Sequence, residues 1–312
     1  MRTLTLSNTD LAVSALCYGC NTIGSTEKGE QADAVLDAYR AAGGNFLDTA
    51  HCYAFWLPGG DGASERYLAD YFKRRGGREK CIIASKGGQR GNPGYRKVDY
   101  HLEPRRVSAD LDDSLGRLNC DTIDLYWLHR DDPRADVKQV IDYLNEEVRR
   151  GRIRHFAASN WPAARIAQAN EYAARQGIKG FVASQPLWSL AWPNKLDPTL
   201  GYFEDVDRPW HERSGLPVIP YSPTARGYFA GGGPQTEAFD TPLSDARRQR
   251  AADLAGRKGC TATQIALAYL MSHPFAVIPI IGTRKTDHLA EAVAALDVSL
   301  SAQEIAWLRD GD

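Results

Sequence analysis

Short apolar runs alternate with longer amphipathic segments along this chain, and the alternation repeats eight times. Runs that are apolar, β-branched or aromatic predict strands, whereas apolar positions spaced three and four residues apart predict helices. The predicted strands lie at residues 15–19, 45–48, 81–85, 122–128, 153–158, 181–184, 217–220 and 276–280. The predicted helices lie at residues 31–42, 64–75, 105–118, 135–150, 163–176, 204–214, 262–272 and 285–294.

The predicted strands are continuously apolar, which is typical of a parallel sheet covered by helices. Eight strand–helix repeats without an internal change of composition predict one (β/α)8 TIM barrel, forming a single domain over residues 1–312. An N-terminal β-hairpin at residues 3–13, turning at Asn8, is expected to close the bottom of the barrel. In such barrels the chemistry takes place in the loops that follow the carboxyl ends of the strands.

Composition narrows the class of partner. The formal net charge is −1, so no global field favours nucleic acid or an anionic membrane, and the expected partner is a small molecule. No apolar run approaches the roughly 18 residues that a membrane span requires. The six cysteines are expected to be reduced thiols of a cytoplasmic protein. Cys17 and Cys20 form a CxxC motif, but no second pair follows, so we predict no metal site.

Four polar residues follow three successive predicted strands. Asp48 ends the second strand and Tyr53 lies in the loop after it, whereas Lys86 and His129 end the third and fourth strands. A tyrosine has a pKa near 10, and a neighbouring lysine cation favours the phenolate. Aspartate keeps a buried lysine charged, and a histidine hydrogen-bonds the oxygen of a carbonyl substrate. This set predicts Tyr53 as the acid in reduction and as the base in oxidation.

Each of the four residues also has a structural interpretation. Asp48 is compatible with a helix cap, Tyr53 with loop packing, Lys86 with an exposed rim position and His129 with a core histidine. The combination of all four on one rim is what favours chemistry.

The combination resembles the aldo-keto reductase family over nearly the whole chain. The segment from Asp48 to Tyr53 resembles the family's Asp-Thr-Ala-x-x-Tyr signature, and Lys86 and His129 match the other two residues of its tetrad. The resemblance implies a nicotinamide-dependent oxidoreductase that interconverts an alcohol with an aldehyde, ketone or keto-sugar. The chain lacks a GxGxxG motif after a strand, and the family does not use that motif.

The resemblance also implies the cofactor site. Ser159, Asn160 and Gln185 match the residues that hold the carboxamide of the nicotinamide, and Tyr221 matches the aromatic residue that stacks on its ring. The residues that follow resemble the loop around the pyrophosphate, namely Ser222, Pro223, Thr224, Arg226 and Gly227.

The adenosine end departs from the family pattern. The matching segment contains Gly282, Thr283, Arg284, His288 and Glu291. His288 stands where many members have arginine or glutamine. Arg284 and Thr283 are suited to a 2′-phosphate, so NADP is preferred, and NAD remains the alternative because these residues also suit a solvated helix start.

Four stretches are expected to wall the substrate pocket: residues 54–63, 87–98, 187–203 and 227–241. These stretches and their surroundings contain Trp56 and Trp188 together with polar residues such as Asn21. Aromatic rings next to polar groups suit a flat, hydroxylated ligand, so we predict a carbohydrate substrate: a sugar, cyclitol or polyol. The alternative is that these tryptophans pack the loops.

Two functions are alternatives to an oxidoreductase. Potassium-channel β-subunits resemble aldo-keto reductases, so a cofactor-binding regulatory module is the main alternative. A barrel glycosidase would require two opposed carboxyl groups, whereas the fourth and seventh strands here supply His129 and Tyr221.

Overall fold

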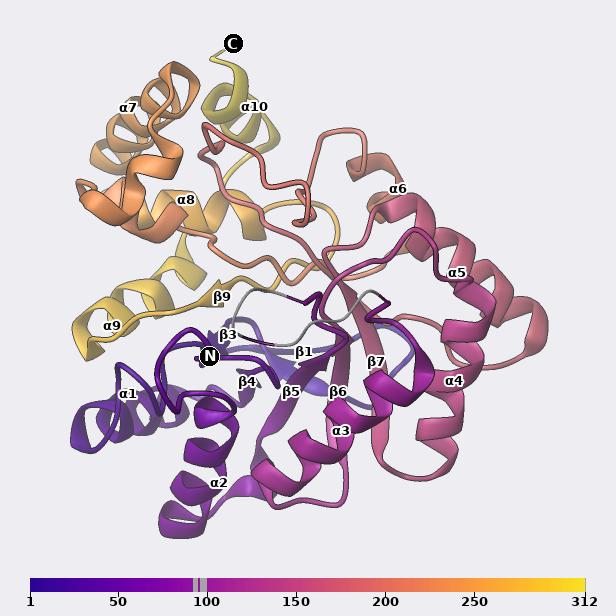
Figure 1. Cartoon of the computed structure of the whole chain (residues 1–312). Coiled ribbons are helices and arrows are strands. Elements are labelled where there is room, and N and C mark those ends of the chain that lie inside the picture. The colour runs from indigo at the N-terminus through magenta and orange to yellow at the C-terminus, as the bar shows by residue number, and fades with distance from the viewer. Residues whose placement is uncertain (92–94, 96–99, 312) are drawn as a thin grey trace.

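The computed structural model describes residues 1–91, 95 and 100–311. Seven parallel strands form one curled sheet in the order β8-β7-β6-β5-β4-β3-β9, with helices around its outside (Figure 1). The strands of this sheet are β3 (Cys17–Gly19), β4 (Phe46–Asp48), β5 (Ile82–Gly87), β6 (Ile123–Leu128), β7 (Ile153–Ser159), β8 (Ser184–Gln185) and β9 (Ile280–Ile281). The chain therefore has the architecture of a (β/α)8 barrel, as the sequence predicts.

The barrel closes through a segment that is shorter than a regular strand. Residues 217–220, predicted as the seventh strand, form only isolated bridges, from Val218 to Ser184 and to Val277. Pro217 and Pro220 flank this segment and have no N–H to donate to a ladder, although their carbonyls accept bonds from Ser184 N and Ile280 N. The predicted strands at 181–184 and 276–280 are likewise reduced, to the short β8 and β9.

Most helices fall where the hydrophobic spacing predicts them. Their bounds are α1 (Glu30–Ala41), α2 (Ala63–Arg75), α3 (Pro104–Leu118), α4 (Val137–Arg149), α5 (Ala163–Gln176), α6 (Arg208–Ser214), α8 (Ala262–Met271) and α9 (Thr286–Ala294). The sixth helix begins at Arg208 instead of residue 204, with a proline in its first turn.

Two helices were not predicted, α7 (Pro242–Lys258) and α10 (Ala302–Asp310). The sequence of α7 is mostly polar, with few apolar positions to mark one face. Arg250 on α7 donates from Nε to Leu308 O on α10 at 3.1 Å, and Figure 1 shows the two helices side by side. The tail of the chain therefore packs on an inserted helix.

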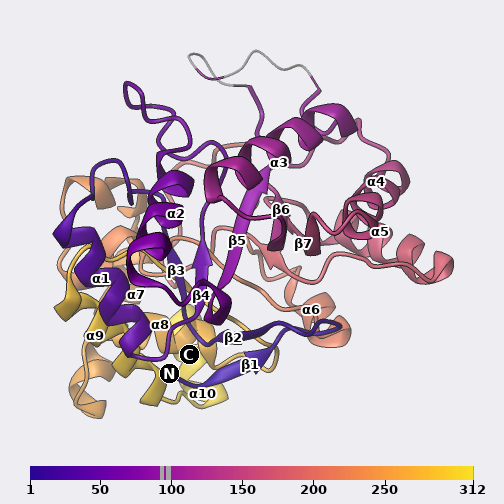
Figure 2. The same ribbon diagram turned by 90° about the horizontal axis from the view of Figure 1, so that it is seen from below.

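The N-terminal hairpin consists of β1 (Thr3–Thr5) and β2 (Ala12–Ser14) and lies across one end of the strands (Figure 2). Leu6, Leu11 and Val13 are fully buried and belong to one cluster with Phe46 and Trp127 of the barrel interior. The hairpin thus fills the bottom of the barrel, which confirms the sequence prediction.

The inward-facing positions of the strands place the site at the opposite end. Side chains in a strand alternate with a period of two. Ala84 and Trp127 lie in the interior cluster, and two residues later come Lys86, within β5, and His129, directly after β6. The same step leads from Phe46 to Asp48. Asp48, Lys86 and His129 therefore form a polar layer directly above the apolar interior, at the carboxyl ends of the strands.

Membrane-spanning helices and clusters of metal ligands are both absent from the described part of the chain. No described helix is long and apolar enough to cross a membrane. No described group of three or more His, Cys, Asp or Glu side chains is arranged to hold a metal ion.

Candidate active site

The ammonium of Lys86 is the centre of the site. It donates to the phenol oxygen of Tyr53 at 2.8 Å, to the backbone oxygen of Thr49 at 2.8 Å and to Oδ2 of Asp48. These bonds match the three donors that an ammonium has. Lys86 is 1% exposed, so the contact with the Asp48 carboxylate offsets the cost of burying its charge.

The phenol of Tyr53 is held in its neutral form. Burial raises the pKa of Tyr53 well above its ordinary value near 10, and the negative charge of Asp48 acts in the same direction. The expectation that the Lys86 cation lowers the pKa of Tyr53 is therefore wrong for the net shift, because desolvation of the phenolate is the larger effect. A neutral phenol is a proton donor, which matches the acid that carbonyl reduction requires.

His129 lies at the end of β6 beside Tyr53, with their rings edge to face and 6.1 Å apart. Its Nδ1 lies 3.4 Å from Sγ of Cys52, which leaves Nε2 as the ring nitrogen available to a ligand. Burial and the nearby charges of Arg130 and Lys86 lower the pKa of His129 well below 6.5. The imidazole is therefore neutral at physiological pH.

A chain of hydrogen bonds connects Asp48 to the residues expected to hold the nicotinamide. Gln185 donates from Nε2 to Oδ1 of Asp48 at 3.1 Å, and Ser159 donates to Oε1 of Gln185 at 3.2 Å. Asn160 then donates from Nδ2 to Oγ of Ser159 at 3.0 Å, and the Tyr221 hydroxyl donates to Oδ1 of Asn160 at 2.8 Å. The structure thus brings these predicted residues together.

The loop after Tyr221 has an unusual backbone. Ser222, Ala225 and Arg226 have φ of 55°, 49° and 60°, in the left-handed region that residues with a Cβ rarely adopt, and Gly227 follows at 93°. Such strained conformations concentrate at functional sites and ligand clamps. Pro223 and Thr224 lie within the same turn, as expected for a loop that wraps a phosphate group.

The segment expected to contact the adenosine end of the cofactor is itself held by residues from two parts of the chain. Arg284 lies with Nε 2.8 Å from Oε1 of Glu27, a carboxylate that is 3% exposed. The hydroxyl of Tyr18 donates to the backbone oxygen of Thr283 at 2.8 Å. Gly282 and His288 are exposed beside them. Arg284 is therefore already paired, which the sequence did not predict.

Glu291 has a structural partner. Its Oε1 accepts a 2.6 Å bond from the hydroxyl of Thr261, which caps α8. This contact ties α9 to α8 and favours a structural role for Glu291. The other residues of the cofactor set fit a nicotinamide dinucleotide, because amide groups, a strained loop and a guanidinium follow one another along the rim.

The predicted substrate residues do not share one environment. Trp56 is 53% exposed and packs edge to face on Phe55 at a ring distance of 5.3 Å, and Asn21 is also exposed. Trp188 is 5% exposed and stacks on Phe203 with ring centroids 3.9 Å apart. Its burial in an aromatic cluster favours the packing interpretation for this tryptophan.

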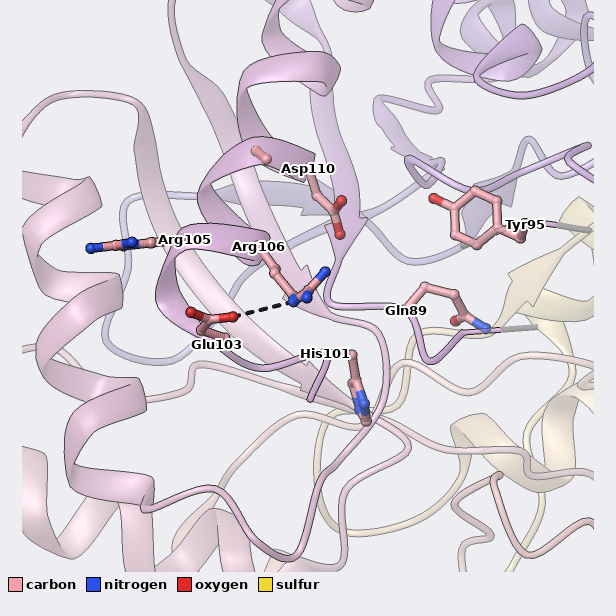
Figure 3. Close-up of a pocket in the computed structure, with 8 residues that line it drawn as sticks. Gln89, Tyr95, His101, Glu103, Arg105, Arg106 and Asp110 are labelled. Carbon is pink, nitrogen blue, oxygen red and sulfur yellow. Dashed lines mark hydrogen bonds and ion pairs between the residues drawn. The ribbon is translucent and has the colours of Figure 1, made fainter. Parts of the chain in front are cut away.

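A pocket of about 290 Å³ lies at the start of α3, and Figure 3 shows the residues around it. They come from the segment after β5 and from the first turns of α3, with the Arg106–Glu103 ion pair at 3.2 Å among them. Tyr95 belongs to the predicted wall at residues 87–98, whereas residues 92–94 and 96–98 lie outside the described part. Asn21, Trp56 and Trp188 are not among its lining residues.

Three residues near the site were not singled out from the sequence in these roles. They are Glu27, which pairs with Arg284, Cys52, which contacts His129, and Arg130, whose Nη1 donates to the backbone oxygen of His129 at 2.9 Å. Only Arg130 carried a sequence signal, because it directly follows a strand-end residue.

Comparison with known proteins settles the family. The model of the Aldo/keto reductase family matches residues 15–310. The chain belongs to this family. It is 31% identical to norsolorinic acid reductase of Aspergillus flavus over 98% of this chain and 79% of that protein. It is 30% identical to a Saccharomyces cerevisiae protein provisionally named an aryl-alcohol dehydrogenase, over 96% of this chain and 83% of that protein.

A solved structure agrees with this assignment. A thermostable aldo-keto reductase in complex with the inhibitor epalrestat superposes with a TM-score of 0.75 at 25% identity, covering 99% of both chains. This aldo-keto reductase therefore shares its fold as well as its sequence motifs with an enzyme of the family, and it is an oxidoreductase.

Proposed function

We propose that this aldo-keto reductase reduces an aldehyde or ketone to an alcohol, with Tyr53 as the proton donor. The observation that carries the proposal is the Lys86 ammonium, which bonds both the phenol of Tyr53 and the carboxylate of Asp48 in a buried site. The raised pKa of Tyr53, caused by its burial, keeps the proton on the phenol until a substrate oxygen accepts it.

Each residue has a separate task in this mechanism. His129, neutral and with Nδ1 beside Cys52, directs Nε2 to the carbonyl oxygen and holds it in line with Tyr53. Lys86 stabilises the negative charge that develops on the Tyr53 oxygen as the proton leaves. Asp48 keeps Lys86 charged and is itself fixed by Gln185.

We propose NADP as the preferred cofactor. Ser159, Asn160 and Gln185 would hold the carboxamide, Tyr221 would pack on the ring, and the loop at residues 222–227 would wrap the pyrophosphate. When bound, the reduced nicotinamide supplies the hydride. Thr283 and Arg284 would contact the 2′-phosphate, with His288 as a further contact.

The substrate class has two candidates. The name of the Saccharomyces cerevisiae relative favours an aromatic alcohol or the matching carbonyl compound, and Phe55 and Trp56 provide accessible aromatic surface. The sugar or polyol predicted from the sequence rests now on Trp56 and Asn21, since Trp188 is buried.

A coupled absorbance assay tests the proposal. Loss of the nicotinamide absorbance band is followed with NADPH or NADH and a panel of benzaldehydes, aryl ketones and keto-sugars, and the reverse reaction with the matching alcohols. We expect turnover of at least one carbonyl compound by the wild-type protein. Tight cofactor binding without turnover of any panel member would instead favour the regulatory role.

A further inference from the structure

The first observation is an arginine directly after the candidate hydrogen-bonding histidine. Arg130 follows His129 at the carboxyl end of β6, and its side chain is partly buried. Its Nη1 donates to His129 O at 2.9 Å, and the same carbonyl accepts a 3.0 Å bond from Nδ2 of Asn160. The guanidinium is thus held at the carboxyl end of β6, beside the backbone of His129 and the side chain of Asn160.

The second observation is that no described carboxylate forms an ion pair with this guanidinium. The two aspartates that follow it are already used, Asp131 by Arg165 at 2.7 Å and Asp132 by Arg134 at 2.7 Å. Oδ1 of Asp197 accepts hydrogen bonds from the backbone N–H and the hydroxyl of Thr199. These bonds are the main cause of the lowered pKa of Asp197, and the charge of Arg130 lowers it further. The guanidinium therefore keeps N–H donors that an anionic ligand could use.

The third observation is that the positive charge of Arg130 affects the pKa values of Tyr53 and His129. Burial dominates the pKa of Tyr53 and of His129, and the positive charge of Arg130 acts on both, favouring the phenolate of Tyr53 and the neutral ring of His129. Arg130 also adjoins His129 in the chain, and its Nη1 lies 2.9 Å from the His129 carbonyl oxygen, so the guanidinium belongs to the same rim as the imidazole expected to contact the substrate.

We propose that Arg130 binds an anionic group, a carboxylate or phosphate, on the carbonyl substrate. Only one of its five N–H donors has a partner among the described residues, so the planar fork can donate to two oxygens of such a group. The inference rests on the proposed carbonyl reduction and adds the charge of the substrate to it. A phosphate of the cofactor is the other source of such an anion, and the experiment separates the two.

The test uses matched substrates of equal size, formylbenzoates with the carboxylate in the 2-, 3- or 4-position and the corresponding neutral formylbenzamides. For wild type we expect at least one formylbenzoate to have a higher kcat/KM than its amide. Arg130→Gln should lower that preference by about 10- to 100-fold, mainly through KM, which is the scale of a hydrogen bond to a charged group. Arg130→Lys should restore part of it.

The control is Arg134→Gln, which removes an equal charge four residues away that is already paired with Asp132. It should leave the ratio of acid to amide unchanged. Equal losses for acid and amide in Arg130→Gln would overturn the inference, because they would assign Arg130 to the electrostatics of Tyr53. A weaker NADPH affinity with an unchanged ratio would assign the guanidinium to the cofactor instead.

Calorimetry measures the binding of an anion without turnover, so it tests the anion site separately from carbonyl reduction. Benzoate and benzamide are titrated into the NADP-loaded wild type and into Arg130→Gln. If no aldehyde is turned over but benzoate binds through Arg130, carbonyl reduction fails while the anion site stands. If formylbenzamides are reduced and benzoate binds no better than benzamide, the reductase stands and the anion site is refuted.

Discussion

The Lys86 ammonium lies 2.8 Å from the phenol oxygen of Tyr53 and bonds Asp48 at the same time. Because all three groups are buried or partly buried, their charges are screened little by solvent. A change at any one of them therefore alters the ionisation of the others.

Replacement of Tyr53 by phenylalanine removes the hydroxyl to which Lys86 donates a hydrogen bond. We expect Tyr53→Phe to lower kcat for carbonyl reduction by about two to four orders of magnitude, the scale of general acid–base catalysis. Cofactor affinity should be unchanged, since Tyr53 is not among the residues expected to hold the nucleotide. Fluorescence titration with NADPH and steady-state kinetics measure the two quantities, and near-normal turnover would remove Tyr53 from the mechanism.

Replacement of Lys86 by methionine tests the charge. The pKa of Tyr53 is already raised by burial, and loss of the neighbouring cation raises it further. Alcohol oxidation requires the phenolate, so its pH profile should move to higher pH in Lys86→Met. An unchanged profile with full activity would show that Lys86 is only structural.

That variant leaves the Asp48 carboxylate buried without its cation. The matched control is therefore the double variant Asp48→Asn/Lys86→Met, which removes both charges of the pair. If the single variant fails to fold and the double variant folds, the pH profile of the double variant is compared with that of Asp48→Asn, because loss of the Asp48 charge alone lowers the pKa of Tyr53. The profile of the double variant should lie above that of Asp48→Asn.

Much of the site was predictable because strand periodicity and barrel topology place it. Asp48, Lys86 and His129 each lie two residues beyond an interior apolar position, so the order of the strands alone brings them to one rim. The helix α7 was not predicted, since its polar sequence carries little periodic signal and its burial depends on α10 and α8. Residues 217–220 do not form the regular strand that was predicted, because the prolines there cannot donate the hydrogen bonds of a complete ladder.

Contacts between distant side chains were the part that the sequence did not specify. The pairing of Glu27 with Arg284 joins loops more than 250 residues apart, and no local pattern marks it. The stack of Trp188 on Phe203 likewise depends on how the loop after β8 folds back. Residue type alone does not distinguish a tryptophan that lines a pocket from one that packs a core.

The two tryptophans of the predicted substrate site should therefore behave differently on truncation. Trp188→Ala removes a buried stack and should lower the free energy of unfolding by about 3–5 kcal/mol, the range for deleting a large core aromatic. Trp56→Ala removes a side chain that is 53% exposed and should change stability by about 0.5 kcal/mol or less. Denaturant unfolding measures both, and equal losses would contradict the assignment of Trp188 to the core.

Cofactor choice should depend on Arg284 together with Glu27. In Arg284→Ala, NADP binding should weaken by about 1.5–3 kcal/mol, the scale of a hydrogen bond to a charged group, while NAD binding stays nearly unchanged because NAD has no 2′-phosphate. The same variant leaves the buried carboxylate of Glu27 without the cation 2.8 Å away, so part of any loss is structural.

The variant Glu27→Gln separates these effects. It removes a negative charge near the expected 2′-phosphate and frees Nε of Arg284, so the preference for NADP over NAD should increase. In Glu27→Gln/Arg284→Ala the structural penalty is absent, and the remaining loss of NADP affinity measures the contact with the phosphate alone. Titration of both cofactors against all four proteins decides the matter. Parallel losses for NADP and NAD in the double variant would place Arg284 at the pyrophosphate or in loop support, and a wild-type preference for NAD would overturn the NADP assignment.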